Sequence, residues 1–151
     1  MKHKSILIVG RSLAMIGLMT CLSHYAAHAS CLTQPDYLVH DLWCSDTAAG
    51  VGELVQVGDV ITNICKSTTA TTETRIYIST NAAQLMCLWE THTTAPLLKN
   101  GSASWSNTLQ VPTCAVPGVT NYIICVADGA AGISESNENN NRKSISIYII
   151  P

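Results

Sequence analysis

The stretch Asn121–Ile150, NYIICVADGAAGISESNENNNRKSISIYII, decides the fold. It opens with an apolar run, Asn121–Ala127, and closes with Ser144–Ile150, where isoleucines occupy every second position from Ile145. Because side chains alternate between the two faces of a β-strand, the closing run is predicted to be a strand with one apolar face. The opening run is predicted to be a central strand. We expect the two strands to pair, since only a polar, turn-rich segment separates them.

Upstream, short β-prone runs alternate with Gly, Asn, Pro and Ser, which is typical of an all-β sandwich. Residues 82–96 are irregular in this respect and give the weakest pattern of the chain. A turn is expected at Gly58-Asp59, and Leu97-Leu98 before Asn100-Gly101 predicts a short edge strand. The remaining predicted strands are Tyr37–Cys44, Val60–Cys65, Thr74–Ser79 (with Thr74, Ile76 and Ile78 on one face) and Ser104–Val111.

Length and composition restrict the class of protein. The chain has 151 residues, of which 47% are hydrophobic and 12% charged, so it is too apolar for disorder and about the size of one domain. It contains no Phe, and its Ser, Thr and Asn suit strands and turns better than a helical bundle. After Ser30 it carries five basic and ten acidic residues, which disfavours electrostatic binding to nucleic acid.

The N-terminus has the pattern of a secretory signal peptide. Lys2, Lys4 and Arg11 precede the apolar run 13–22, and Ala27-His28-Ala29 forms a small-residue cleavage site. We therefore expect a signal peptide over residues 1–29 and a secreted domain over 30–151, with no membrane span. A periplasmic location is the alternative, as is a lipoprotein anchored through Cys21 after Leu18-Met19-Thr20.

The turn-rich segment between the last two predicted strands resembles the end of the bacterial cell-adhesion-related domain, CARDB. The resemblance rests on Asp128 after a strand, a short turn, Ile133, and Glu135-Ser136-Asn137-Glu138 followed by Asn139–Asn141. Weaker likeness covers about residues 35–150. It implies an immunoglobulin-like or fibronectin-III-like sandwich of seven strands, used as a non-catalytic binding or spacer module outside the cell. The chain departs from the family pattern at Cys65-Lys66-Ser67, where an Asn-x-Gly turn is common, and in the six cysteines that follow the predicted signal peptide.

These cysteines predict disulfides, because an even number in an exported domain is typical of a disulfide framework. No CxxC pair occurs, so three structural bridges are favoured over a zinc or redox site. Cys65 and Cys125 lie in the strands that an immunoglobulin-type bridge would join. Strand parity argues against that pair, and bridges that fix loops and the N-terminal arm are the alternative. The pairing stays open among Cys31, Cys44, Cys65, Cys87, Cys114 and Cys125.

Two kinds of binding residue are candidates. Oxygen-bearing side chains between 128 and 140 could bind calcium, although Asn and Asp in turns more often cap backbone donors. Trp89, in the irregular stretch, is the candidate for a recognition surface, whereas Trp43 beside Cys44 is expected to fill the core. The candidate calcium ligands are Asp128, Glu135, Asn137, Glu138 and Asn140.

Catalytic patterns are weak. There is no G-x-S-x-G motif, His40 and His92 are expected at the surface, and Glu135 and Glu138 lie too close along one loop to flank a sugar. The sequence therefore predicts a non-enzymatic adhesion or interaction module that binds an extracellular protein or glycan, with no cofactor other than possible calcium. A self-assembling structural subunit of a surface filament and an exported hydrolase inhibitor are the alternatives.

Overall fold

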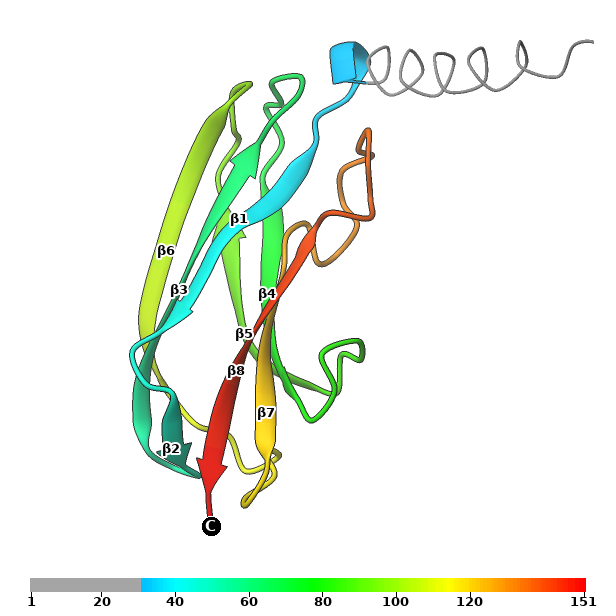
Figure 1. Cartoon of the computed structure of the whole chain (residues 1–151). Coiled ribbons are helices and arrows are strands. Elements are labelled where there is room, and N and C mark those ends of the chain that lie inside the picture. The colour runs from blue at the N-terminus through cyan, green and yellow to red at the C-terminus, as the bar shows by residue number, and fades with distance from the viewer. Residues whose placement is uncertain (1–30) are drawn as a thin grey trace, which may run out of the picture.

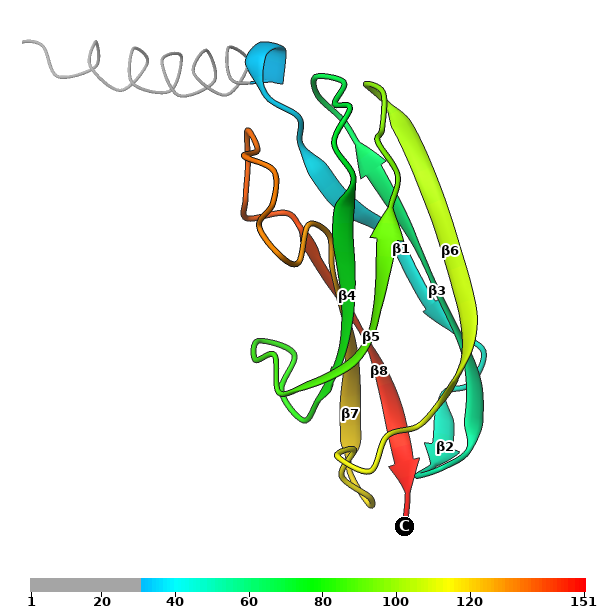
Figure 2. The same ribbon diagram turned by 180° about the vertical axis from the view of Figure 1, so that it is seen from behind.

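The computed structural model describes residues 31–151 and shows two β-sheets packed face to face (Figure 1). One sheet has three strands in the order β1-β3-β6 and the other has five in the order β2-β8-β7-β4-β5. Figure 2 shows the same two layers from behind, with β6 as an edge strand of the three-stranded sheet and β5 as an edge strand of the five-stranded sheet. The strands are β1 Tyr37–Cys44, β2 Ala48–Gly50, β3 Leu54–Asn63, β4 Thr72–Ser79, β5 Cys87–Thr94, β6 Gly101–Gln110, β7 Thr120–Val126 and β8 Arg142–Ile150.

The all-β disulfide-linked sandwich is confirmed, with eight strands where seven were predicted. The predicted pairing of the last two long strands is also confirmed, because β7 and β8 run antiparallel with Ile123 opposite Ile145. The short edge strand predicted at Leu97-Leu98 is wrong. These residues lie in the β5–β6 connection, and β5 comes instead from the irregular stretch.

The core lies between the inner faces of the two sheets. In β8 the alternation has the predicted effect, since Ile147 and Ile149 are buried and Ile145 is half-buried. In β7 the inward residues are Ile123 and Cys125. The largest buried apolar side chains are Tyr37, Val57, Ile61, Ile76, Ile78, Val111, Ile123, Ile124, Ile147 and Ile149.

The predicted turn at Gly58-Asp59 is wrong, because both residues lie in the middle of β3. Glycine and aspartate usually mark turns, so each needs a tertiary reason here. Gly58 lies directly beneath the Trp43 indole, where an added Cβ would stand 2.7 Å from Nε1. Asp59 points inward, and its compensation is described below.

Two disulfides link the described residues, Cys31–Cys65 and Cys87–Cys114, while Cys44 and Cys125 are free thiols. The first joins the N-terminal arm to the residues after β3, and the second joins β5 to the β6–β7 connection. The pair Cys65–Cys125 and a third bridge are therefore wrong. Cys125 is fully buried between the sheets, whereas Cys65 lies beyond the end of β3.

Candidate functional site

The segment 127–141 between β7 and β8 lies at one end of the sandwich, beside the arm that leads into β1 (Figure 1). Two hydrogen bonds hold the arm to it: Ser136 N donates to Pro35 O at 2.8 Å, and Gln34 Nε2 donates to Ser134 Oγ at 2.9 Å. The base of the segment is closed by a 2.8 Å bond from Ala127 N to Asn141 O. The segment thus connects the two sheets at this end.

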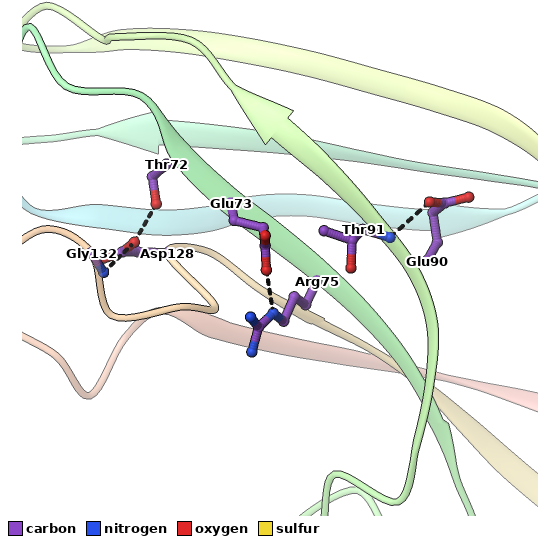
Figure 3. A network of polar contacts seen from close by, with 7 residues as sticks. All are labelled: Thr72, Glu73, Arg75, Glu90, Thr91, Asp128 and Gly132. Carbon is purple, nitrogen blue, oxygen red and sulfur yellow. Dashed lines mark hydrogen bonds and ion pairs between the residues drawn. The ribbon is translucent and has the colours of Figure 1, made fainter.

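Asp128 organises the first turn of this segment. Its backbone is in the left-handed region, with φ of 44°, and its carboxylate accepts hydrogen bonds from Gly132 N at 3.0 Å and Ile133 N at 2.8 Å. The Thr72 hydroxyl on β4 donates to the same carboxylate (Figure 3). Asp128 is 4% exposed, so all three donors are satisfied away from water. Beside this turn, the Arg75 side chain lies over Gly129 and pairs with Glu73.

Glu135 holds β1 to the same segment. Its carboxylate accepts from Tyr37 N and, at 3.0 Å, from Asn141 Nδ2. Burial raises the pKa of Glu135 to about 7, and the nearby charges of Glu138 and Asp128 act in the same direction. Glu135 is therefore a buried anchor whose ionisation the fold opposes.

This raised pKa gives a pH prediction. The folded chain keeps the Glu135 proton between about pH 4.5 and 7, where the unfolded chain has lost it, so this residue lowers stability as pH rises through that window. The free energy of unfolding of Glu135→Gln minus that of the wild type should therefore be about 1–2 kcal/mol larger at pH 8 than at pH 4.5. Chemical denaturation at both pH values measures this, with Glu90→Gln as the control. A difference independent of pH would contradict it.

The remaining candidate calcium ligands also contact protein. Glu138 Oε1 accepts from Glu135 N at 3.0 Å, Asn137 Oδ1 accepts from Asn139 N at 3.1 Å, and Asn140 Nδ2 donates to Asp36 Oδ1 at 2.8 Å. No group of three or more His, Cys, Asp or Glu residues within 31–151 is arranged to hold a metal ion. Glu138 and Asn137 thus cap the backbone of the segment, and calcium would have to displace these two donors, whereas the buried Asn140 Oδ1 has no hydrogen-bond partner.

Calcium binding stays a prediction, and thermal melting tests it. If calcium binds the folded chain, 5 mM CaCl₂ should raise Tm relative to EDTA, because a ligand of the native state stabilises it by mass action. MgCl₂ at the same concentration is the control for ionic strength. Equal melting temperatures in calcium and EDTA would contradict calcium binding and leave these side chains with their capping role alone.

Asn63 is an organising residue that the sequence reasoning missed. It is fully buried at the end of β3; its Oδ1 accepts from Asp36 N at 3.0 Å and Cys65 N at 3.1 Å, and its Nδ2 donates to Lys66 O and Leu97 O. These four hydrogen bonds fix the turn of the chain that follows β3. The sequence feature that could have identified Asn63 is its position as a polar residue at the end of the alternating stretch 54–63.

His92 contradicts its expected surface position, whereas His40 is exposed as expected. His92 Nε2 lies 2.8 Å from Asp59 Oδ2, and the two side chains are 9% and 0% exposed. The imidazole also stacks on Trp105 with ring centroids 4.3 Å apart. Next to this pair is the Cys125 thiol, whose pKa is raised by burial and by the Asp59 charge. A protonated, buried thiol is a poor nucleophile, so the cluster is structural.

The tryptophan assignments are also wrong in part. Trp89 is half-buried against the core, and its Nε1 donates to Gln110 O at 2.9 Å, while its role in recognition stays a prediction. Trp105 packs against the core as well. Trp43 lies instead on the outer side of the three-stranded sheet, over Gly58. Neighbouring residues of one strand point to opposite faces, and the bulge between Val39 and Asp41 shifts the register of β1 before Trp43.

Comparison with known proteins agrees with this architecture. The CARDB family model matches residues 34–145. The chain belongs to the CARDB family. CARDB is a family of non-enzymatic, adhesion-related domains found in cell-surface proteins, so the resemblance carried by the segment 128–149 is confirmed. A search of curated proteins found no match.

Solved CARDB domains have the same fold. A crystal structure of the CARDB domain of PF1109 from Pyrococcus furiosus, in complex with di-metal ions, has 20% identity and a TM-score of 0.60 over 78% of this chain and 94% of that one. The solution structure of the same domain has 22% identity and a TM-score of 0.60, over 78% and 96%. A Methanosarcina acetivorans domain has 14% identity and a TM-score of 0.58, over 78% and 94%. At these identities the likeness shows the fold.

The predictions about targeting concern residues outside the described part of the chain. The signal peptide over 1–29 and the lipid-anchor alternative at Cys21 both lie there. Within residues 31–151, no helix is both long and apolar enough to cross a membrane.

Proposed function

We propose that this CARDB domain is a secreted, non-catalytic interaction module that binds an extracellular protein or glycan. The observation that carries the proposal is the match of a disulfide-linked sandwich to an adhesion-related family over residues 34–145. Disulfides persist in oxidising, extracytoplasmic compartments, which supports export. The buried carboxylates of the family signature, Asp128 and Glu135, accept bonds from the backbone, which supports a role in holding the fold.

Affinity capture tests this function. The full chain, expressed for export and purified oxidised, is immobilised and exposed to envelope extracts of its own cells and of candidate host cells. Saturable retention of one component, reversed by free folded protein, is the expected result. A reduced and alkylated sample controls for non-specific adhesion. If neither extract contains a component that the folded protein retains better than the alkylated control, the binding role is overturned.

Self-assembly into a surface structure is the second candidate, and one feature favours it. The end of the sandwich where β8 terminates exposes several apolar side chains. Hydrogen bonds from Gly118 N to Ile149 O and from Ile149 N to Val119 O bring the β6–β7 connection beside β8 there. The exposed residues are Val51, Leu54, Val116, Val119, Tyr148 and Ile150.

Light scattering after size exclusion separates the two functions. A monomer at every concentration from 1 to about 500 µM would favour the binding module. Oligomers that grow with concentration, and that Leu54→Glu dissolves, would favour assembly, because a charge at an apolar interface is costly to bury. Ser146→Glu is the matched control, since Ser146 is exposed on the outer face of the five-stranded sheet.

A further inference from the structure

The outer face of the three-stranded sheet is open. No segment of residues 31–151 crosses it in either view (Figures 1 and 2). The outward positions of β3 and β6 alternate with the buried ones, so Gly58 and Ser106, which pair in the register, lie on this face next to each other. Trp43 of β1 pairs with Gly58 from the other side. The three strands therefore present one continuous surface with an indole near its centre.

The Trp43 indole lies flat against this surface. Its Cε2 and Nε1 atoms would stand 2.5 and 2.7 Å from a Cβ at Gly58, so the ring can cover this part of β3 only because the residue beneath it is glycine. Unlike Trp89 Nε1, Trp43 Nε1 makes no hydrogen bond within residues 31–151, and it is not sealed from solvent. The ring is half-buried, with one side on the strand. The indole therefore offers the solvent side of its ring as a flat apolar surface, with a free N–H donor at the edge of that ring.

Hydroxyl groups surround this indole. The outward residues of β6 form an exposed row, and Ser102 Oγ lies 2.7 Å from the Thr62 hydroxyl on β3. The charged Asp41 also lies on this face, two residues before Trp43 on β1 and opposite Val60 of β3, and its carboxylate is paired with Lys143 Nζ of β8 at 3.6 Å. None of the outward residues around the indole on β3 and β6 is charged: Gln56, Gly58, Val60, Thr62, Ser102, Ser104, Ser106 and Thr108.

This chemistry selects an uncharged ligand rich in hydroxyls. An anionic ligand is bound by Arg or Lys, and none lies among these residues. Protein interfaces are depleted in Ser and enriched in several aromatic anchors, whereas this face has a row of serines and one tryptophan. An aromatic ring supplies an apolar surface with a polar donor at its edge, which complements a sugar ring with C–H groups on its face and hydroxyls around its rim.

We propose that this face, centred on Trp43, binds a neutral glycan. The proposal rests on the interaction function above and names the ligand class and the surface. One face of a sugar ring stacks on the indole, and its hydroxyls bond with Trp43 Nε1 and with the hydroxyl row of β6. Trp43 is then the binding residue, in place of Trp89.

Affinity electrophoresis tests this inference. The oxidised full chain is run through gels that contain a soluble neutral polysaccharide: hydroxyethyl cellulose, glycol chitin, starch, β-glucan or mannan. Retardation by at least one of them is expected. Trp43→Ala should weaken that binding at least tenfold, and so should Ser106→Glu, which places a charge beside the indole. Ser146→Glu, on the other sheet, should bind as the wild type does. Circular dichroism and Tm verify that each variant is folded.

Three outcomes would overturn the inference. They are the absence of retardation by all five neutral polymers, retardation that survives both Trp43→Ala and Ser106→Glu, and retardation by anionic polymers such as polygalacturonate alone. Failure of the wider function is distinguishable from these. A protein captured from envelope extract equally well by wild type and Trp43→Ala would reject the glycan face and keep the interaction module.

Discussion

Asp59→Ala is expected to destabilise the chain by about 1–3 kcal/mol, the usual cost of leaving a buried polar group without its hydrogen-bond partner. Asp59 is 1% exposed and lies between the sheets, with His92 Nε2 at 2.8 Å. Without the carboxylate, the imidazole keeps its stack on Trp105 but has no hydrogen bond at either nitrogen, because Nδ1 is already unpartnered. Denaturant unfolding of the oxidised protein measures the loss.

A double-mutant cycle separates the pair from simple loss of volume. The two single variants are Asp59→Val, which leaves His92 unpaired, and His92→Phe, which preserves an aromatic ring against Trp105 and leaves Asp59 unpaired. The double variant, which combines these two changes, removes both polar groups. We expect the double variant to be at least about 2 kcal/mol more stable than the sum of the two single changes predicts. Additive effects would show that the two side chains are energetically independent.

Asp128→Ala is expected to cost about 3–4 kcal/mol, since buried hydrogen bonds to a charged group contribute more than neutral ones. The change removes the acceptor for two backbone amides, Gly132 N and Ile133 N, and for the Thr72 hydroxyl. It also leaves alanine at φ 44°, where residues with a Cβ are strained and Asn or Asp is better tolerated. Denaturant unfolding gives the total, and faster hydrogen exchange at Gly132 and Ile133 gives the location.

Two controls accompany this variant. Asp128→Asn keeps one acceptor oxygen and a residue suited to the backbone, so it should recover at least half of the lost stability. Asp46→Ala, an exposed aspartate after β1, should change stability by less than about 0.5 kcal/mol. A loss below about 1 kcal/mol for Asp128→Ala would show that water replaces the carboxylate at these amides.

The sequence predicted best where a pattern repeats along a single strand. The inward isoleucines of β8 follow from period-two alternation, which a local stretch displays completely. The bounds of β1 follow from a β-prone run, and the pairing of β7 with β8 follows from the turn-rich segment between them. The segment 128–141 was also identifiable, because its Asp, Glu and Asn residues occur in a fixed order. Its role was less clear, since whether Glu135 faces calcium or the amide of Tyr37 depends on a strand 98 residues away.

The sequence by itself determined an all-β sandwich of the CARDB family. Only the tertiary structure decided the environment of individual polar and aromatic residues. Gly58 and Asp59 look like a turn until Trp43 covers one and His92 pairs with the other. The physical reason is that hydrophobic patterning is a property of one strand, whereas disulfides, buried polar pairs and the burial of each indole depend on which strands meet in the sandwich.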